Sequence, residues 1–97
     1  MAHYILLLKY TDQGIRNVKD TTKRAAAFGE MAEKMGAKVT SILWTMGQYD
    51  LVTHLEAPND ETVAALSVGV SRLGNVSAQT LRAFTAAEVD GILKKAG

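Results

Sequence analysis

The feature that most constrains the fold is the stretch from Ala37 to Pro58, where strand-forming residues are dense on both sides of Gly47-Gln48. β-Branched and aromatic residues suit a pleated, half-buried surface. A glycine at the first position of a two-residue loop fits a type II′ turn, which needs a positive φ there. The stretch therefore predicts a hairpin that ends at Pro58, since proline cannot donate to a ladder. The turn sets the pairs Met46–Tyr49, Trp44–Leu51 and Ile42–Thr53.

A strand and a helix are expected before this hairpin. The consecutive apolar residues Ile5–Leu8 predict a first strand, His3–Thr11, that is buried on both faces. A turn is expected at Asp12–Gly14, and then a helix over about Val18–Met35 with Gly36 as its C-terminal cap. The core-facing stripe of this helix is Phe28, Met31, Ala32 and Met35.

A helix, a strand and a tail are expected after the hairpin. Asn59 or Asp60 can cap a helix that runs to about Leu73, and Asn75–Thr85 alternates like a fourth strand. The stripe of this helix is Val63, Leu66, Val70 and Leu73. The tail Ala86–Ala96 is expected to be helical, with an apolar side made of Val89, Ile92 and Leu93. The order β-α-β-β-α-β predicts one ferredoxin-like α+β domain over residues 1–97, with a four-stranded antiparallel sheet and the first strand beside the third.

In such a fold the helices cover one face of the sheet and leave the other open. Pairing Tyr4 with Leu55, and Tyr10 with Tyr49, sorts the side chains between the two faces. The helix side then carries Tyr4, Leu6, Leu8, Tyr10, Tyr49, Leu51, Leu55, Ile42 and Trp44. The open side carries His3, Ile5, Leu7, Lys9, Asp50, Val52, His54 and Glu56, with Val39 and Leu43 at its centre. Because such an apolar centre is too large to leave bare, we expect a homodimer or higher oligomer of the dimeric α-β barrel type.

Composition and patterning exclude several classes of function. The net charge is +1 and basic residues are interleaved with acidic ones, so no nucleic-acid surface is predicted. No apolar run approaches the ~20 residues that span a bilayer, and the N-terminus has no secretory pattern, so we expect a cytoplasmic protein. The absence of cysteine excludes disulfides and thiolate chemistry. Gly47 and Gly74 are isolated, so there is no phosphate loop and no cofactor is expected.

Several segments together resemble a known family. They are Tyr10–Gly14, Arg24-Ala25, Leu43–Asp50, Glu56–Asp60, Gly74–Val76 and Thr80–Thr85. With Gly47-Gln48-Tyr49-Asp50 among them, the chain resembles the GYD-domain family of small bacterial proteins over nearly its whole length. The resemblance implies a ferredoxin-like fold, oligomers and an uncharacterised biochemical function. More distantly, Gly47–Val52 is similar to Lrp/AsnC-type effector domains, which implies dimers that bind small molecules between their subunits.

Six residues are candidates for a ligand site: Lys9, Trp44, Tyr49, Asp50, His54 and Arg82. Asp50 opposite Lys9 is either an ion pair that fixes the register or the charged floor of a pocket. Arg82 either clamps a carboxylate or bridges to an acidic residue across an interface. The charged candidates therefore have a structural and a functional interpretation each.

The aromatic and histidine candidates also have alternatives. Trp44 and the tyrosines either belong to the core or line an apolar cavity. His3 and His54, with Glu56 nearby, form a set that can bind a divalent metal. They lie on different strands without a local ligand motif, so we expect hydrogen-bonded histidines and no stoichiometric metal.

No serine has a triad signature, so no catalytic residue is predicted. We therefore expect a homo-oligomeric small-molecule-binding or assembly module without catalysis. One alternative is a cofactor-free monooxygenase or isomerase of the dimeric α-β barrel type, which rests on fold analogy. A third is metal storage or sensing through His3 and His54.

Overall fold

The computed structural model describes residues 1–97. Its strands are β1 (Ala2–Tyr10), β2 (Lys38–Trp44), β3 (Leu51–Ala57) and β4 (Val76–Ala83). Its helices are α1 (Asp12–Arg16), α2 (Thr21–Lys34), α3 (Asp60–Ser71) and α4 (Ala86–Ala96), with a 3₁₀ turn, Val18–Asp20, before α2. The predicted order is confirmed, and α1 and the 3₁₀ turn are additions to it.

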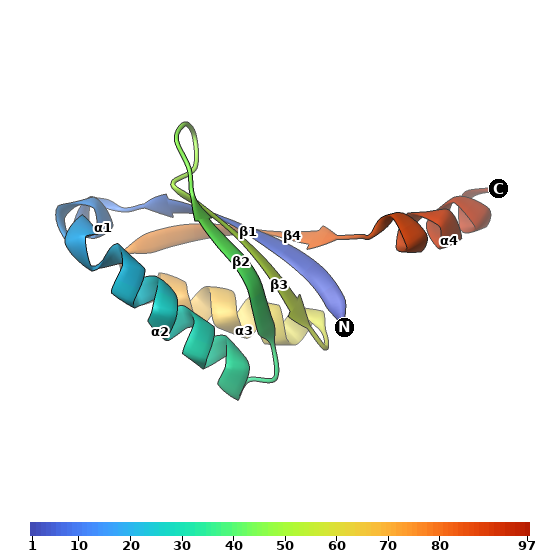
Figure 1. Ribbon diagram of the computed structural model, residues 1–97, viewed down its shortest axis with the longest axis horizontal. Coiled ribbons are helices and arrows are strands. Elements are labelled where there is room, and N and C mark those ends of the chain that lie inside the picture. Colours follow the sequence, from blue (N-terminus) through green and yellow to red (C-terminus); the bar gives the residue numbers. More distant parts are fainter.

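The four strands form one antiparallel sheet in the order β2-β3-β1-β4, and α2 and α3 lie on the same face of it (Figure 1). β1 lies beside β3, as right-handed crossovers require. This is the ferredoxin-like α+β arrangement that the element order predicted. α4 projects away from the body beyond the end of β4 (Figure 1), and none of its residues is buried.

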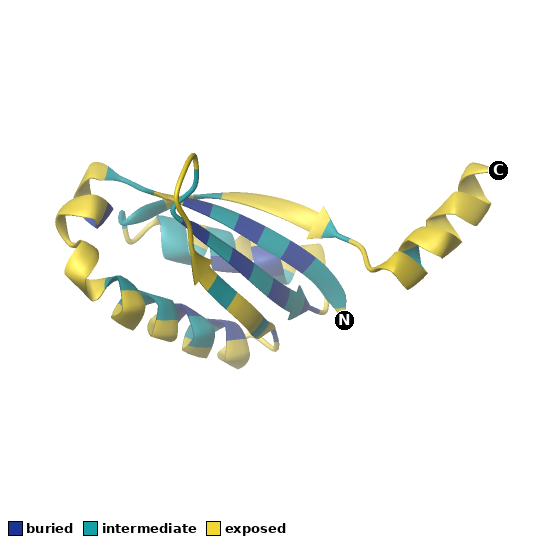
Figure 2. Cartoon of the chain, turned by 45° about the horizontal axis from the view of Figure 1, so that its top comes forward, coloured by how far each residue is buried: buried dark blue, intermediate teal, exposed yellow.

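The core lies between the sheet and the helices α2 and α3. β1 and β3 alternate between buried and half-buried residues, which Figure 2 shows as bands along both strands. The core cluster is Tyr4, Leu6, Leu8, Phe28, Ala32, Ala37, Leu51, Leu55, Ala57, Val63 and Leu66. The predicted helix stripes are wrong at their ends, where Met35 is 37% and Leu73 is 63% exposed. Both residues lie beyond the last helical turn and therefore no longer follow the helix period.

The predicted caps of α2 and α3 are confirmed. Gly36 has a φ of +80°, and the Ala37 N–H donates to the Ala32 carbonyl at 2.9 Å. This is the bond that closes a Schellman motif. Asn59 caps α3 because its side chain accepts a hydrogen bond from the Thr62 N–H at 2.9 Å. Local chemistry thus fixes the end of α2 and the start of α3.

The prediction of a turn at Asp12–Gly14 is wrong, since α1 begins there. Thr11 caps α1 by accepting a hydrogen bond from the Gly14 N–H at 3.1 Å. A Cβ on Gly14 would lie 1.9 Å from the Asn75 carbonyl oxygen, so the backbones of α1 and the loop before β4 meet without room for a side chain. The predicted helix over Val18–Met35 is correspondingly shorter, because its first residues form the 3₁₀ turn.

The prediction of a two-residue hairpin turn is also wrong. The pairs Trp44–Leu51 and Ile42–Thr53 form as predicted. The strands stop at Trp44 and Leu51, however, and residues 45–50 make a longer loop in which Met46 is 99% exposed. The predicted Met46–Tyr49 pair is therefore absent, although Gly47 has the expected positive φ, +109°.

Asp50 ties the longer loop to β1, while its carbonyl also accepts the Thr45 N–H across the hairpin at 2.8 Å. Its backbone N–H donates to the Leu8 carbonyl, and its carboxylate accepts from the Tyr10 N–H, each at 2.8 Å. The expected ion pair between Lys9 and Asp50 is therefore wrong. The expected pairing of Tyr10 with Tyr49 is also wrong, since the β1–β3 ladder ends at Leu8–Leu51.

Two residues lie on the opposite face from the predicted one. A bulge between Val39 and Ser41 shifts the register of β2, and Val39 packs against the core on the helix side. Tyr49 lies on the open side, where its hydroxyl donates to Gln79 at 2.8 Å and the Lys9 ammonium lies 5.6 Å from its ring centre. The predicted faces of the other sheet residues follow from the confirmed β1–β3 register, in which Tyr4 pairs with Leu55.

Candidate functional site

The open face is the face of the sheet that is turned away from α2 and α3. Directly paired residues share a face, so Leu43, Val52 and Leu7 form one apolar row across three strands. The next row contains Ile5 and Leu81. Leu43 is 62% exposed and Leu81 is 38% exposed. No helix covers this apolar patch, which makes the open face a candidate interface.

His3 and His54 lie together at one end of the open face. The His3 Nδ1 and the His54 Nε2 are 3.0 Å apart, and the two rings stack with their centres 5.2 Å apart. Glu56 is the direct partner of His3 in the ladder, as predicted. No group of three or more histidine, cysteine or acidic side chains could hold a metal ion. The geometry is that of a hydrogen-bonded histidine pair.

Lys9 and Tyr49 lie at the other end of the open face. Lys9 is exposed and contacts the Tyr49 ring, as described above. Asp50 does not join them, because its carboxylate is used by the Tyr10 N–H. The structure therefore brings Lys9 and Tyr49 together, whereas the Asp50 side chain is bonded to the backbone of β1.

Arg82 lies on the helix side at the edge strand, paired with Tyr4. Its guanidinium lies 4.4 Å from the centre of the Phe84 ring and 5.5 Å from that of Tyr4. It also donates to the His3 carbonyl at 3.3 Å, and it lies 3.9 Å from the Glu88 carboxylate. These contacts all lie within one chain, so they are neither the predicted carboxylate clamp nor the predicted bridge across an interface.

Two ionisable groups near Arg82 have shifted pKa values. The hydrogen bond that Tyr4 donates to Asp60 raises the pKa of the Tyr4 phenol, and burial adds to that effect. The hydrogen bond that the Thr85 N–H donates to Glu88 lowers the pKa of this carboxyl. Thr85 and Glu88 form the capping box that begins α4.

Trp44 lies on the helix side, as expected. Its indole N–H donates to the Thr21 hydroxyl at 3.0 Å, and the Tyr10 hydroxyl lies 2.9 Å from the same oxygen. Thr21 is the first residue of α2. The two aromatic residues therefore hold the start of α2 against the sheet.

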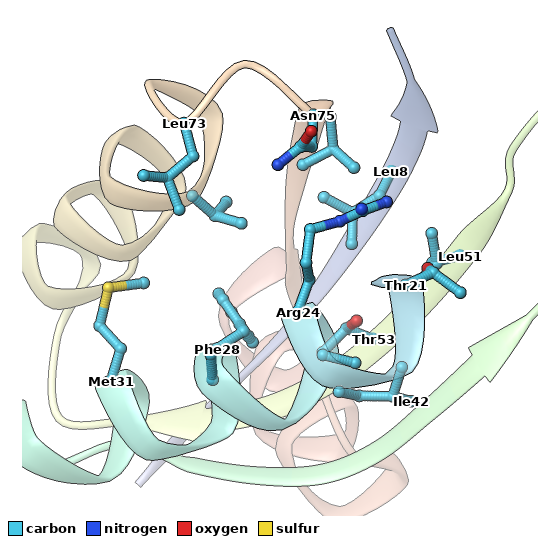
Figure 3. Close-up of a pocket in the computed structure, with 14 residues that line it drawn as sticks. Leu8, Thr21, Arg24, Phe28, Met31, Ile42, Leu51, Thr53, Leu73 and Asn75 are labelled. Carbon is cyan, nitrogen blue, oxygen red and sulfur yellow. The ribbon is translucent and has the colours of Figure 1, made fainter. Parts of the chain in front are cut away.

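A cavity of about 210 Å³ lies between α2, α3 and the sheet, and Figure 3 shows its lining. Ten of its fourteen lining residues are hydrophobic. Leu8, Leu51 and Thr53 lie on the central strands, and Thr53 is the buried polar residue of the lining. Arg24, Thr21 and Asn75 are the remaining polar residues of the lining.

Sequence reasoning did not find this cavity. Arg24-Ala25 belonged to the segments that carried the family resemblance, but nothing in the sequence of α2 indicates that a space separates this helix from α3. None of the six predicted site residues lines the cavity. His54 lies at one end of the open face, and Lys9 and Tyr49 lie at the other. Arg82 lies on the edge strand β4, Asp50 is bonded to the backbone of β1, and Trp44 is bonded to Thr21. The predicted ligand site thus does not assemble within one chain.

No helix of this chain combines the length and the apolar character that crossing a membrane requires.

Comparison with known proteins gives two matches. The GYD domain, as a family model, matches residues 4–93. A protein of Thermus thermophilus, described as "Glutamine synthetase and cystathionine beta-lyase binding protein", is 28% identical over 95 residues. The alignment covers 97% of this chain and the whole of that relative.

Proposed function

The chain belongs to the GYD-domain family, and we propose that it is a homo-oligomeric binding module without catalysis. In this proposal two copies pair through the open faces of their sheets, and the assembly docks on other proteins and holds a small ligand. The observation that carries the proposal is the uncovered apolar patch on the sheet.

The patch supports pairing with a second copy. Leu7 and Val52 lie at the centre of the sheet, and Leu43 and Leu81 extend the patch to its two edge strands. Two such faces packed about 10 Å apart form an isologous interface, in which the same patch serves both subunits. A standard interface buries about 1,600 Å² in total, and at about 25 cal/mol per Å² of apolar area its gross driving force is ample before association costs are subtracted.

The relative from Thermus thermophilus supports docking on other proteins, because its description names two enzymes that it binds. We propose glutamine synthetase and cystathionine β-lyase as the first partners to test for this chain. The cavity supports binding over catalysis. Arg24 is the one ionisable residue among its lining, so the cavity offers a charge to a ligand but no general base.

Sedimentation of the purified protein tests the pairing. We expect a dimer, or a multiple of one, at micromolar concentration. Leu7→Lys and Val52→Lys should give a folded monomer, because each places a charge in the apolar interface. Ala65→Lys is the matched control, since it adds the same charge to an exposed position on α3. A stable monomer of the unmodified chain would contradict the pairing.

Calorimetric titration tests the docking, with both enzymes prepared from the organism that encodes this chain. We expect one of them to bind the wild-type protein with heat changes that saturate. Absence of binding by a protein that sediments as a dimer would remove the docking part of the proposal and leave the pairing intact.

A further inference from the structure

We propose that the cavity between α2, α3 and the sheet binds a small apolar monocarboxylate, whose carboxylate is held by Arg24. The inference deepens the small-molecule part of the proposed function by naming a site and a class of ligand. It does not depend on the pairing of two chains, because the cavity lies on the helix side of the sheet and the proposed pairing uses the open face.

The cavity has a physical origin in how the two helices are spaced. α2 and α3 meet where a Cβ on Gly69 would lie 3.3 Å from the Met31 sulfur. From there the lining continues to Thr21 at the start of α2 and to Leu73 beyond the end of α3. The α2 side includes Ala25, whose short side chain cannot fill the gap above the central strands. The space is therefore built into the packing of the fold.

The size of the cavity limits the ligand. A cavity of about 150 Å³ lined by apolar side chains stays dry and takes a benzene molecule. The present cavity, at about 210 Å³, therefore suits a ligand of about eight to ten non-hydrogen atoms. Its lining is mostly aliphatic, with Phe28 as the single aromatic residue, so a branched aliphatic chain fits it.

The charge of the lining indicates the head group. Arg24 extends from α2 past the cavity toward Leu8 (Figure 3), and the chain's one salt bridge, between Arg82 and Glu88, does not involve it. No aspartate or glutamate lines the cavity. The Asn75 side chain accepts from Gln13 through its oxygen at 3.0 Å, which leaves its NH₂ group free to donate. A guanidinium without a carboxylate partner and a free amide donor together suit a carboxylate.

Arg24 also makes hydrogen bonds within the chain, and these alone would fit a purely structural role. It donates to the Asn17 carbonyl at 2.7 Å and to the Gly14 carbonyl at 3.3 Å. These bonds orient the guanidinium but use two of its five N–H donors. These carbonyls carry no net charge, so the positive charge of Arg24 beside the cavity has no negatively charged partner in the chain.

The test compares an acid with its uncharged amide. 4-Methylpentanoate and 4-methylpentanamide have nearly the same shape, and each is titrated into the protein with detection by amide and methyl chemical shifts. We expect saturable shifts at Leu8, Thr53 and Val70, and binding of the acid at least about tenfold tighter than that of the amide, as loss of one charge-assisted contact implies.

Two pairs of variants locate the effect. Arg24→Gln should remove the preference for the acid, whereas Arg16→Gln should keep it, because Arg16 also bonds a carbonyl of α1, that of Asp12, but does not line the cavity. Ala25→Leu should fill the cavity and abolish binding of both ligands. Ala26→Leu is its control, since Ala26 is exposed and lies outside the lining.

Equal binding of acid and amide by the wild-type protein would overturn the proposal, as would no saturable shift at millimolar ligand or binding that survives Ala25→Leu. If Arg24→Gln does not fold, the wild-type comparison and the Ala25→Leu pair still decide it. A dimer in sedimentation with no ligand binding would contradict this inference and leave the pairing untouched.

Discussion

β1 shows the difference between the two faces of the sheet within four consecutive residues. Leu6 and Leu8 are 0% and 7% exposed beneath the helices, whereas Ile5 and Leu7 on the open face are half-buried. Hydrophobicity alone does not separate these positions, since all four residues are large and aliphatic. The chain covers one face with its own helices and leaves the other uncovered. Stability of the single chain therefore depends on Leu6 and Leu8, whereas the pairing that we propose would depend on Ile5 and Leu7 of the same strand.

The largest effect is expected from breaking the covered face. Leu6→Ala should lower the free energy of unfolding by about 2–5 kcal/mol, because it leaves a cavity in a fully buried site. Leu7→Ala should cost under about 1 kcal/mol in a dilute monomer. Urea unfolding at low and high protein concentration measures both. The loss at Leu6 should not depend on concentration, and equal losses at the two positions would contradict the contrast between the faces.

A smaller effect is expected at the hairpin loop, which brings Tyr49 onto the open face. Gly47→Val should cost about 1–3 kcal/mol, because a β-branched residue resists the φ of +109°. A Cβ there would meet no atom of another part of the chain within 4 Å, so the cost comes from the local backbone conformation and not from a clash with another residue. Thermal melts measure it, with Gln48→Val as the neighbouring control. An unchanged midpoint for Gly47→Val would show that the loop adapts.

The smallest effect is expected at the Tyr4 hydroxyl, where the covered face contacts the start of α3. Tyr4→Phe removes one partly buried hydrogen bond to Asp60 and should cost about 0.5–1.5 kcal/mol at neutral pH. Because the pKa of Tyr4 is raised in the folded state, the unfolded chain loses its proton first, and wild-type stability should fall as the pH rises through about 10. The Phe variant should lose less stability over this window. Parallel pH curves from urea unfolding would count against the shift.

The sequence predicted the fold well because its signals were local and periodic. The alternation around Trp44 and Val52 set the strands and most of the register, and Gly36 and Asn59 marked helix ends. The apolar run Ile5–Leu8 correctly indicated a strand, but burial on both faces was predicted and the single chain buries only the helix-side residues.

The errors arose where bonds between distant residues override a local pattern. Asp50 makes hydrogen bonds to β1 in addition to its bond across the hairpin, and the bulge at Thr40 accompanies a side-chain bond to the His54 carbonyl at 3.0 Å. The candidate site was predicted less well for the same reason. The cavity depends on the distance between two helices, and no spacing along the chain encodes that distance.

The projection of α4 has a consequence for folding cooperativity. An isolated helix of this length is marginal in water, and α4 is held to the body through the contact between Arg82 on β4 and Glu88 in its first turn. Its amide hydrogens should therefore exchange with solvent through local opening, independently of the global unfolding that protects the core strands. If a second chain packs against Val89, Ile92 and Leu93, the two processes merge, and the tail joins the cooperative unit of the assembly.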